Sequence, residues 1–420
     1  MKFEILKKTH LKRNILIGVL VVGVITAVIL NFTRAKYKTT QSIPLVNGTI
    51  NYSLADLNIV AIYVEGESVD TIPNGNYELS SESYCAIDGE RDDSISLSYD
   101  HSTKALSISP MTKKGTKCYL YFDEVQLYLR EEILSHATTQ ITRSNFSMVV
   151  TDTTTETIYY EDTTKGRTYY FAGNPTDNWV KFDDYYWRVI RINEDNSIRL
   201  IYAGTDVGGD THVSLSRFNS IYTNNMYVGY MFQNNVLHGL QDNSTIKDIL
   251  DSWYQNYLID SQNYIDGNAG FCGDRTLHEG TGLGTTQTTY GAYNRLYLSR
   301  SPSLECSNED LYTYVGANQG NQALTYPIGL ISADETVYAG ASWHLDNSEF
   351  YLYPSKFFWT MSPYMFYGTT NARVFIIDGD GWLNYNDVNI IGGVRPVINL
   401  KSDVTISSGN GTSSQPYVIS

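Results

Sequence analysis

Between residues 364 and 389 the sequence carries a dense set of aromatic and amide side chains. Aromatic rings offer flat apolar contact area, and Asn side chains both donate and accept hydrogen bonds, which is the chemistry that recognises a sugar or a peptide. We interpret this segment as a ligand-binding surface, against the alternative that its tyrosines face the core of their own domain. The candidate binding residues are Tyr364, Tyr367, Asn371, Trp382, Asn384, Tyr385, Asn386, Asp387 and Asn389.

The same segment contains Asp378 and Asp380 in the run Asp-Gly-Asp-Gly. Alternating carboxylates of this kind open many calcium loops, but here Trp382 takes the place of the next ligand and no Glu completes the loop. Two Asp-Gly pairs between apolar strands are also typical of a hairpin turn. We prefer the turn, with calcium at Asp378 and Asp380 as the weaker alternative and no other cofactor expected.

Catalysis is not expected from the sequence. A His-Glu pair with an Asp and an Arg nearby could transfer protons, but such a pair in a Gly-rich loop is ordinarily a surface feature. No nucleophile elbow, phosphate-binding loop or metalloprotease motif occurs. Arg395 precedes a proline, and its guanidinium suits a structural role in holding carbonyl groups or a carboxylate. The pair is His278-Glu279, and the nearby residues are Asp274 and Arg275.

The four cysteines fall into two well-separated groups, Cys85 with Cys118 and Cys272 with Cys306. Of three conceivable connectivities, pairing within each group is the simplest. Each bond would close a loop of about 34 residues and stabilise the fold by roughly 3–4 kcal/mol. Since the spacing fits no zinc motif, the cysteines indicate disulfides and an exported protein.

Composition limits the class of protein and of partner. The chain has 420 residues, 42% of them hydrophobic, which suits two or three globular domains. Its formal net charge is -15 even though the first forty residues are basic. A chain this acidic has no electrostatic attraction for nucleic acid, so we exclude that partner.

An apolar run from Ile15 to Leu30 predicts a transmembrane helix, with Asn14, Asn31 and Phe32 at its interfaces. Lys and Arg are more numerous before the run than after it, which favours a cytoplasmic N-terminus. No small-residue cleavage site follows the run, so an uncleaved anchor is preferred to a signal peptide. We therefore expect a single-pass cell-membrane protein, with residues 1–38 as tail and anchor and the large C-terminal part extracellular.

The remaining residues predict an α+β fold that is mainly β. Residues 39–123 contain short β-branched and aromatic runs between turns, which predict a small membrane-proximal β domain. Residues 124–166 are interpreted as a spacer, with a helix beginning at Asp123 followed by a Thr-rich linker or exposed hairpin. Residues 167–420 would form the larger domain, with one helix capped by Thr245 and Asp248.

Three C-terminal segments resemble the closing part of a domain of unknown function in bacterial surface proteins. They are WTMSP (359–363), RVFIIDGDGWLNYNDVN (373–389) and GVRPVINL (393–400); YWRVIRINEDNSIRLI (186–201) resembles the opening of the same domain. That domain belongs among the C-type-lectin-like folds, so the resemblance implies this fold for residues 167–420. The N-terminal segment, including residues 32–52, is also similar to the start of such proteins.

Two better-known groups of this fold class suggest different functions. Variable proteins diversified by retroelements bind ligands through aromatic and Asn-rich positions, similar in composition to residues 364–389. Formylglycine-generating enzymes use two closely spaced cysteines, a pattern from which Cys272 and Cys306 depart. The resemblance therefore implies recognition of an extracellular glycan or protein. The alternatives are a structural or sensory envelope ectodomain with a protein partner, and an oxidase or hydrolase of the formylglycine-enzyme type.

Overall fold

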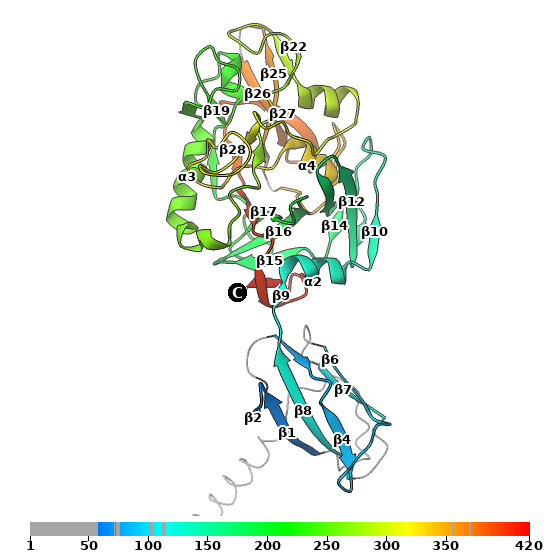
Figure 1. Ribbon diagram of the computed structural model, residues 1–420. Helices are drawn as coiled ribbons and strands as arrows, with labels where there is room; N and C mark the ends of the chain where they lie inside the picture. The colour runs from blue at the N-terminus through cyan, green and yellow to red at the C-terminus, as the bar shows by residue number, and fades with distance from the viewer. Residues whose placement is uncertain are drawn as a thin grey trace, which may run out of the picture. The chain divides into compact units, whose positions relative to one another are not determined.

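The computed structural model describes residues 58–70, 72, 76–100, 105–110, 115–354, 356–368 and 371–420. These residues belong to two compact units, one that ends at Glu124 and one from Val125 to Ser420 (Figure 1). The predicted membrane anchor lies outside the described residues. In the part of the chain that is described, no helix is both long enough and apolar enough to cross a bilayer.

The first unit is a small β structure centred on β8, which pairs with β1, β3 and β4. Alternate side chains of β8, namely Cys118, Leu120 and Phe122, are buried in its core, as the pleat of a strand dictates. Strands β6 and β7 form a separate hairpin. The strands are β1 Asn58–Val64, β2 Glu67–Val69, β3 Tyr77–Leu79, β4 Tyr84–Ile87, β5 Glu90–Arg91, β6 Ser96–Asp100, β7 Ala105–Ser109 and β8 Lys117–Glu124.

The second unit is built on two sheets, the larger of which has β16 in its middle, paired with β13, β15 and β17. Every side chain of β17 is buried, which is typical of a strand covered on both faces. The strands of this sheet are β9 Leu127–Tyr128, β10 Thr139–Ile141, β12 Thr157–Thr163, β13 Gly166–Tyr170, β15 Trp179–Phe182, β16 Tyr185–Ile192, β17 Ile198–Gly204, β29 Val397–Leu400, β30 Thr405–Ser408 and β31 Tyr417–Ile419.

The smaller sheet of the second unit is centred on β25, which pairs with β23, β26 and β28. Figure 1 shows β25 and β26 toward the end of the unit opposite β9 and the C-terminus. Its strands are β18 Ser214–Ser216, β22 Leu277–Glu279, β23 Thr288–Tyr290, β25 Phe358–Tyr367, β26 Asn371–Ile377, β27 Leu383–Asp387 and β28 Gly392–Val394.

Arg395 lies where the chain passes from β28 in one sheet to β29 in the other. Its side chain is 1% exposed, and its guanidinium donates to the carbonyl oxygens of Tyr202 (2.9 Å) and Leu352 (3.1 Å). These bonds satisfy backbone groups at the junction of the sheets. The structural role expected for Arg395 is confirmed.

The predicted spacer over 124–166 is not separate, because residues from Val125 onward belong to the second unit. Helix α2, Leu129–His136, begins later than expected, since Asp123 is still part of β8. It places Leu129 and Ile133 in the core of the second unit. The Thr-rich stretch forms β11 and most of the β12–β13 hairpin, because β-branched residues favour pairing in a sheet.

Helix α3, Thr245–Tyr257, occurs where the sequence predicts it and buries Ile246, Leu250 and Tyr254 on one face. Its cap differs from the expectation. The hydroxyl of Ser244 accepts from the backbone N of Lys247 at 3.4 Å. The hydroxyl of Thr245 instead accepts from the backbone N of Ser220 at 2.9 Å, which leaves the capping position to the preceding serine.

Short elements lie between the strands of the two sheets, some before α3 and the others in the irregular region between α3 and β25. Both predicted disulfides are confirmed: Cys85–Cys118 joins β4 to β8, and Cys272–Cys306 holds the irregular region together. The short elements are β11 Thr153–Thr154, β14 Asn174–Pro175, β19 Met231–Phe232, β20 Asp242–Asn243, β21 Phe271–Cys272, β24 Leu311–Tyr312, α4 Ala333–Tyr338, the 3₁₀ helices η1 Asn225–Val228 and η2 Ile259–Tyr264, and the π-helix η3 Tyr293–Leu298.

Candidate functional site

The predicted binding segment forms the hairpin of β26 and β27, whose register divides its side chains between two faces. Tyr385 and Asp387 point to one face, because alternate residues of a strand lie on the same side. Asn384 and Asn386 point to the other. The sequence expectation of one continuous surface is therefore corrected to two surfaces on opposite sides of the hairpin.

On the Tyr385 side, stacked aromatic rings form a partly exposed cluster that we call the aromatic surface. Tyr385 stacks on Tyr364 with ring centres 4.2 Å apart, and Tyr364 stacks on Trp343 at 5.6 Å. His344 stacks on Trp343 at 4.6 Å, and Trp382 meets His344 edge-on at 5.1 Å. Aromatic pairs in these geometries fix one another's orientation. The aromatic surface comprises Tyr293, Tyr297, Trp343, His344, Trp382 and Tyr385, of which Trp343 is only 6% exposed and supports the others.

Trp382 and Tyr385 reach the same cluster although they would alternate in a regular strand. Strand β27 begins only at Leu383, so Trp382 belongs to the turn before it. The backbone N of Asp378 donates to the carbonyl oxygen of Trp382 at 3.1 Å, which closes that turn. The turn thus breaks the alternation and brings both side chains to one side.

Four members of the aromatic surface were not identified from the sequence. Tyr293 and Tyr297 come from η3, and their spacing of four residues, which places side chains on one helical face, was the available signal. Trp343 and His344 follow α4, in a segment joined to β27 by a bridge between Trp343 and Leu383. No local pattern marks that pair, because only the tertiary structure brings it to the hairpin.

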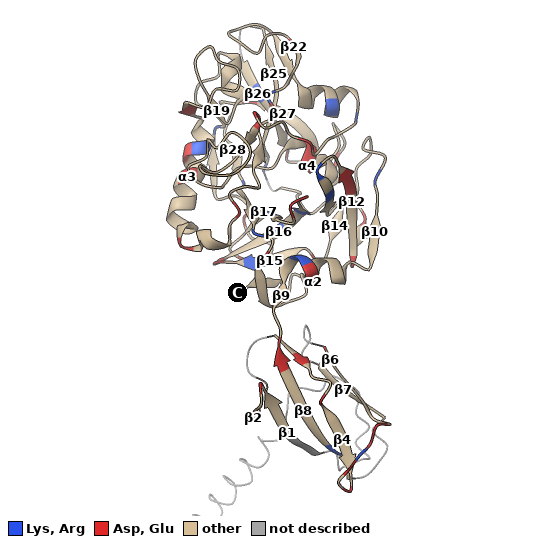
Figure 2. Ribbon diagram, in the orientation of Figure 1, with Lys and Arg blue, Asp and Glu red and all other residues tan. Residues whose placement is uncertain are grey.

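Polar groups border the aromatic surface at the open end of the hairpin. The Nε of Arg373 donates to Oδ1 of Asp387 at 2.8 Å, and the amide of Asn371 donates to the other oxygen. The guanidinium also lies over the ring of Tyr385, 5.1 Å from its centre. Few other charged residues occur along β25, β26 and β27 (Figure 2). A planar donor and a carboxylate thus stand beside a ring face.

Not every predicted binding residue reaches solvent. Tyr364 is 4% exposed and forms the base of the stack, which corrects its assignment as a contact residue. Burial raises the pKa of its hydroxyl far above the ordinary value, and the neighbouring Tyr385 adds to this. Tyr367 is 55% exposed at the end of β25. Asn389 follows β27, and its carbonyl oxygen accepts from Nε of Arg217 at 2.9 Å.

The other side of the hairpin holds a shallow depression of about 460 Å³. Asn384 and Asn386 line it together with Lys356 and Ile391, which is 56% exposed. It is mixed in character and has no stacked rings. The predicted Asn residues therefore belong to a surface separate from the aromatic one.

The Asp-Gly-Asp-Gly run is the turn of the hairpin. Oδ1 of Asp378 accepts from the backbone N of Asp380 (3.0 Å) and of Trp382 (3.2 Å), and Oδ2 accepts from the amide of Asn384 (3.1 Å). Both carboxylate oxygens thus serve the turn. Among the described residues, no three His, Cys, Asp or Glu side chains gather to hold a metal, and calcium here stays a prediction.

The four residues noted around the His-Glu pair do not converge. His278 and Glu279 are exposed on β22, whereas the side chains of Asp274 and Arg275 are buried. Asp274 pairs with Arg295 instead. The arrangement provides no paired acid and base at this position.

The chain was also compared with known proteins. No family model, curated protein or solved structure matches it.

Proposed function

We propose that the second unit is an extracellular recognition domain that binds a glycan through the aromatic surface. The observation that carries this proposal is the ring of Tyr385, held parallel to Tyr364 and partly exposed beside the Arg373–Asp387 pair. A sugar ring offers an apolar face to such an aromatic ring and hydroxyl groups to the adjoining donors and acceptors. Pre-stacked rings also lose little conformational freedom when a ligand binds.

The C-type-lectin-like fold, the membrane anchor and the cell-surface location belong to the same proposal. The two disulfides support an oxidising compartment. The mainly β second unit, with its long crosslinked irregular region, is compatible with a lectin-like domain. On this interpretation the protein is a receptor or adhesin, without catalytic activity.

The test is a glycan array with the purified full-length chain, followed by affinity measurements for the best glycan with Tyr297→Ala and Trp382→Ala. Truncating a well-placed aromatic contact should weaken binding by about 2 kcal/mol, roughly thirtyfold. Tyr128→Ala is the matched control, because Tyr128 and Tyr297 are both 37% exposed and Tyr128 lies on β9. The control should bind like the wild type.

Two results would overturn the proposal. One is the absence of binding to any glycan on the array. The other is a glycan whose affinity is the same in the wild type, Tyr297→Ala and Trp382→Ala. If the wild type captured a single extracellular protein and both variants failed to capture it, the ligand of the aromatic surface would be a protein and not a glycan.

A further inference from the structure

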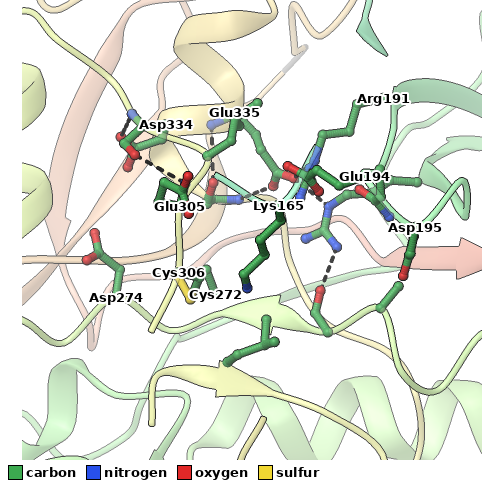
Figure 3. Close-up of a pocket in the computed structure, with 18 of the residues that line it drawn as sticks. Lys165, Arg191, Glu194, Asp195, Cys272, Asp274, Glu305, Cys306, Asp334 and Glu335 are labelled. Carbon is green, nitrogen blue, oxygen red and sulfur yellow. Dashed lines mark hydrogen bonds and ion pairs between the residues drawn. A yellow bond between two sulfur atoms is a disulfide. The ribbon is translucent and has the colours of Figure 1, made fainter. Parts of the chain in front are cut away.

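A second concave site lies beside the Cys272–Cys306 disulfide, in a pocket of about 310 Å³ (Figure 3). Its walls come from segments far apart in sequence: the turn between β12 and β13, the turn between β16 and β17, strand β21, η3 and the start of α4. Ionic side chains dominate its lining. They include six carboxylates, Glu194, Asp195, Asp274, Glu305, Asp334 and Glu335, and four cations, Lys165, Arg191, Arg199 and Arg295.

The buried cations of this pocket are occupied by the protein's own carboxylates. Oε1 of Glu335 lies 3.0 Å from Nε of Arg191 and 2.6 Å from Nε of Arg199. Arg191 also contacts Glu194 at 3.4 Å. The remaining donors of Arg199 bond to the carbonyl oxygens of Gly270 and Leu330 and to a side-chain amide. These guanidinium groups are therefore neutralised within the fold.

Arg295 is shared in the same way between two carboxylates. Its Nε and Nη2 donate to Asp334 at 2.9 and 2.8 Å, and Nη1 and Nη2 donate to Asp274. The backbone N of Ser303 donates to Asp334 as well, at 2.8 Å. Four of the five N–H donors of Arg295 are thus taken up by these two carboxylates.

What remains unsatisfied at the pocket is an acceptor. Asn193 is among the residues that line the pocket and is 5% exposed, and its buried Oδ1 has no hydrogen-bond partner among the described residues. Its amide group already donates to Ser197 (2.7 Å) and Asn399 (3.2 Å), which fixes the oxygen as the free group. Even with Asp274 protonated, five carboxylates face four cations in the lining, so the pocket favours a positively charged hydrogen-bond donor.

We propose that this pocket binds a ligand that carries an aliphatic primary ammonium group. An ammonium is a compact cation with three donors, so it can bond to a carboxylate and to further acceptors of the lining at the same time. The volume of about 310 Å³ is at the lower end of the range for small-molecule sites, roughly 300–1,000 Å³. A lysine side chain or a short diamine has both the charge and the slenderness that this pocket requires.

Lys165 is the natural competitor of such a ligand. It is exposed on the turn between β12 and β13, and it makes no ion pair with another described residue. Figure 3 shows its side chain extending across the pocket. The neighbouring Thr164 donates from its backbone N and hydroxyl to Oε1 of Glu305, at 2.8 and 2.7 Å, which holds this turn at the pocket edge.

The experiment is calorimetric titration of the full-length chain with 1,5-diaminopentane, with N-acetyl-lysine amide and with glutarate, an anion of similar length. Both amines should bind and glutarate should not. Binding of the lysine derivative alone would identify a lysine-bearing chain as the source, whereas equal binding of both would identify the ammonium and alkyl chain as sufficient.

Two variants with opposite expected effects on affinity test where the amine binds. Lys165→Gln should strengthen amine binding roughly threefold to tenfold, since it removes a like charge near the site. Glu305→Gln should weaken it by a similar factor, and its amide oxygen can still accept from Thr164. The matched controls are Lys401→Gln and Glu349→Gln, both at exposed positions elsewhere, and their affinities should stay within about twofold of the wild type.

Several outcomes would overturn the proposal. They are a failure of both amines to bind, binding of glutarate in preference to them, and an affinity that Lys165→Gln lowers or leaves unchanged. Because both variants alter exposed side chains, a loss of binding cannot be attributed to failure to fold once their melting temperatures match the wild type.

Discussion

The aromatic surface and the ionic pocket belong to the same unit, yet they are built from opposite kinds of side chain. The aromatic surface presents ring faces that stack on one another and stay partly open to solvent. The pocket presents charges that are buried and mutually neutralised, such as Glu335 between Arg191 and Arg199. Both arrangements are pre-organised, but for different physical reasons.

This difference predicts where each site tolerates change. A ring at the edge of a stack can be removed with little loss of buried area, so its truncation should affect binding more than folding. A charge inside a neutralised pair leaves its partner uncompensated when it is removed, so the fold itself should suffer. The two sites should therefore respond oppositely to mutation.

The largest effect should come from Glu335→Ala. The substitution leaves Arg191 and Arg199 buried with only Glu194 nearby, which should lower the free energy of unfolding by about 3–5 kcal/mol. Urea denaturation monitored by tryptophan fluorescence would measure this. Glu349→Ala is the control, because Glu349 is exposed, and it should change stability by less than about 0.5 kcal/mol. A loss below about 1 kcal/mol for Glu335→Ala would contradict the contrast between the sites.

The next effect is a difference in stability between a buried and an exposed tyrosine of β25. Tyr364→Ala removes the buried base of the stack and should cost about 3 kcal/mol of stability, as for other large core aromatics. Tyr367→Ala changes the residue at the exposed end of the same strand, 55% exposed, and should cost below about 1 kcal/mol. Thermal unfolding of both variants is the measurement. Equal melting temperatures would mean that Tyr364 does not support the stack.

The smallest of the three effects concerns Asp274. Burial raises its pKa to about 7, with Asp334 and Asp310 adding to the rise and Arg295 opposing it. An unfolded Asp titrates near pH 3.9, so between about pH 4 and pH 7 the folded chain holds one proton more than the unfolded chain. The stability contributed by this group therefore falls as the pH rises through that window.

Asp274→Asn should remove this dependence. The difference in free energy of unfolding between the variant and the wild type should shift by about 2 kcal/mol in favour of the variant from pH 5 to pH 8. Loss of the ion pair with Arg295 also destabilises the variant, but by an amount that is the same at each pH. Urea midpoints at several pH values provide the comparison, with the exposed Asp346→Asn as control. Parallel pH profiles for Asp274→Asn and the wild type would refute the role of burial.

Local chemistry predicts much of the fold but less of the sites. Strands such as β7, β16 and β17 are runs of β-branched and apolar residues, which local propensity is sufficient to identify. Helix α2 begins later than expected because residues before it pair in sheets, a long-range preference that overrides local pattern. The cysteine pairing was also predictable, since two separated groups leave one simple solution.

The sites depend on contacts that no local pattern encodes. Trp382 and Tyr385 could be predicted from the sequence because they belong to one hairpin. Trp343 lies about forty residues away along the chain and reaches them only through tertiary packing. Asp274 was noticed only for its position near His278, because its actual partner Arg295, which also pairs with Asp334, lies on another element. Buried ion pairs of this kind are visible only after the chain has folded.

Helix η3 supplies both sites from a single stretch of chain. Tyr293 and Tyr297 contribute to the aromatic surface, while Arg295 between them holds the carboxylates of the ionic pocket. Any occupant of the pocket that alters the pairing of Arg295 must act on the backbone that carries those two rings. By thermodynamic reciprocity, a ligand on the rings would then change the affinity of the pocket by the same factor. If both proposed ligands bind, the π-helix is the element through which their affinities would be coupled.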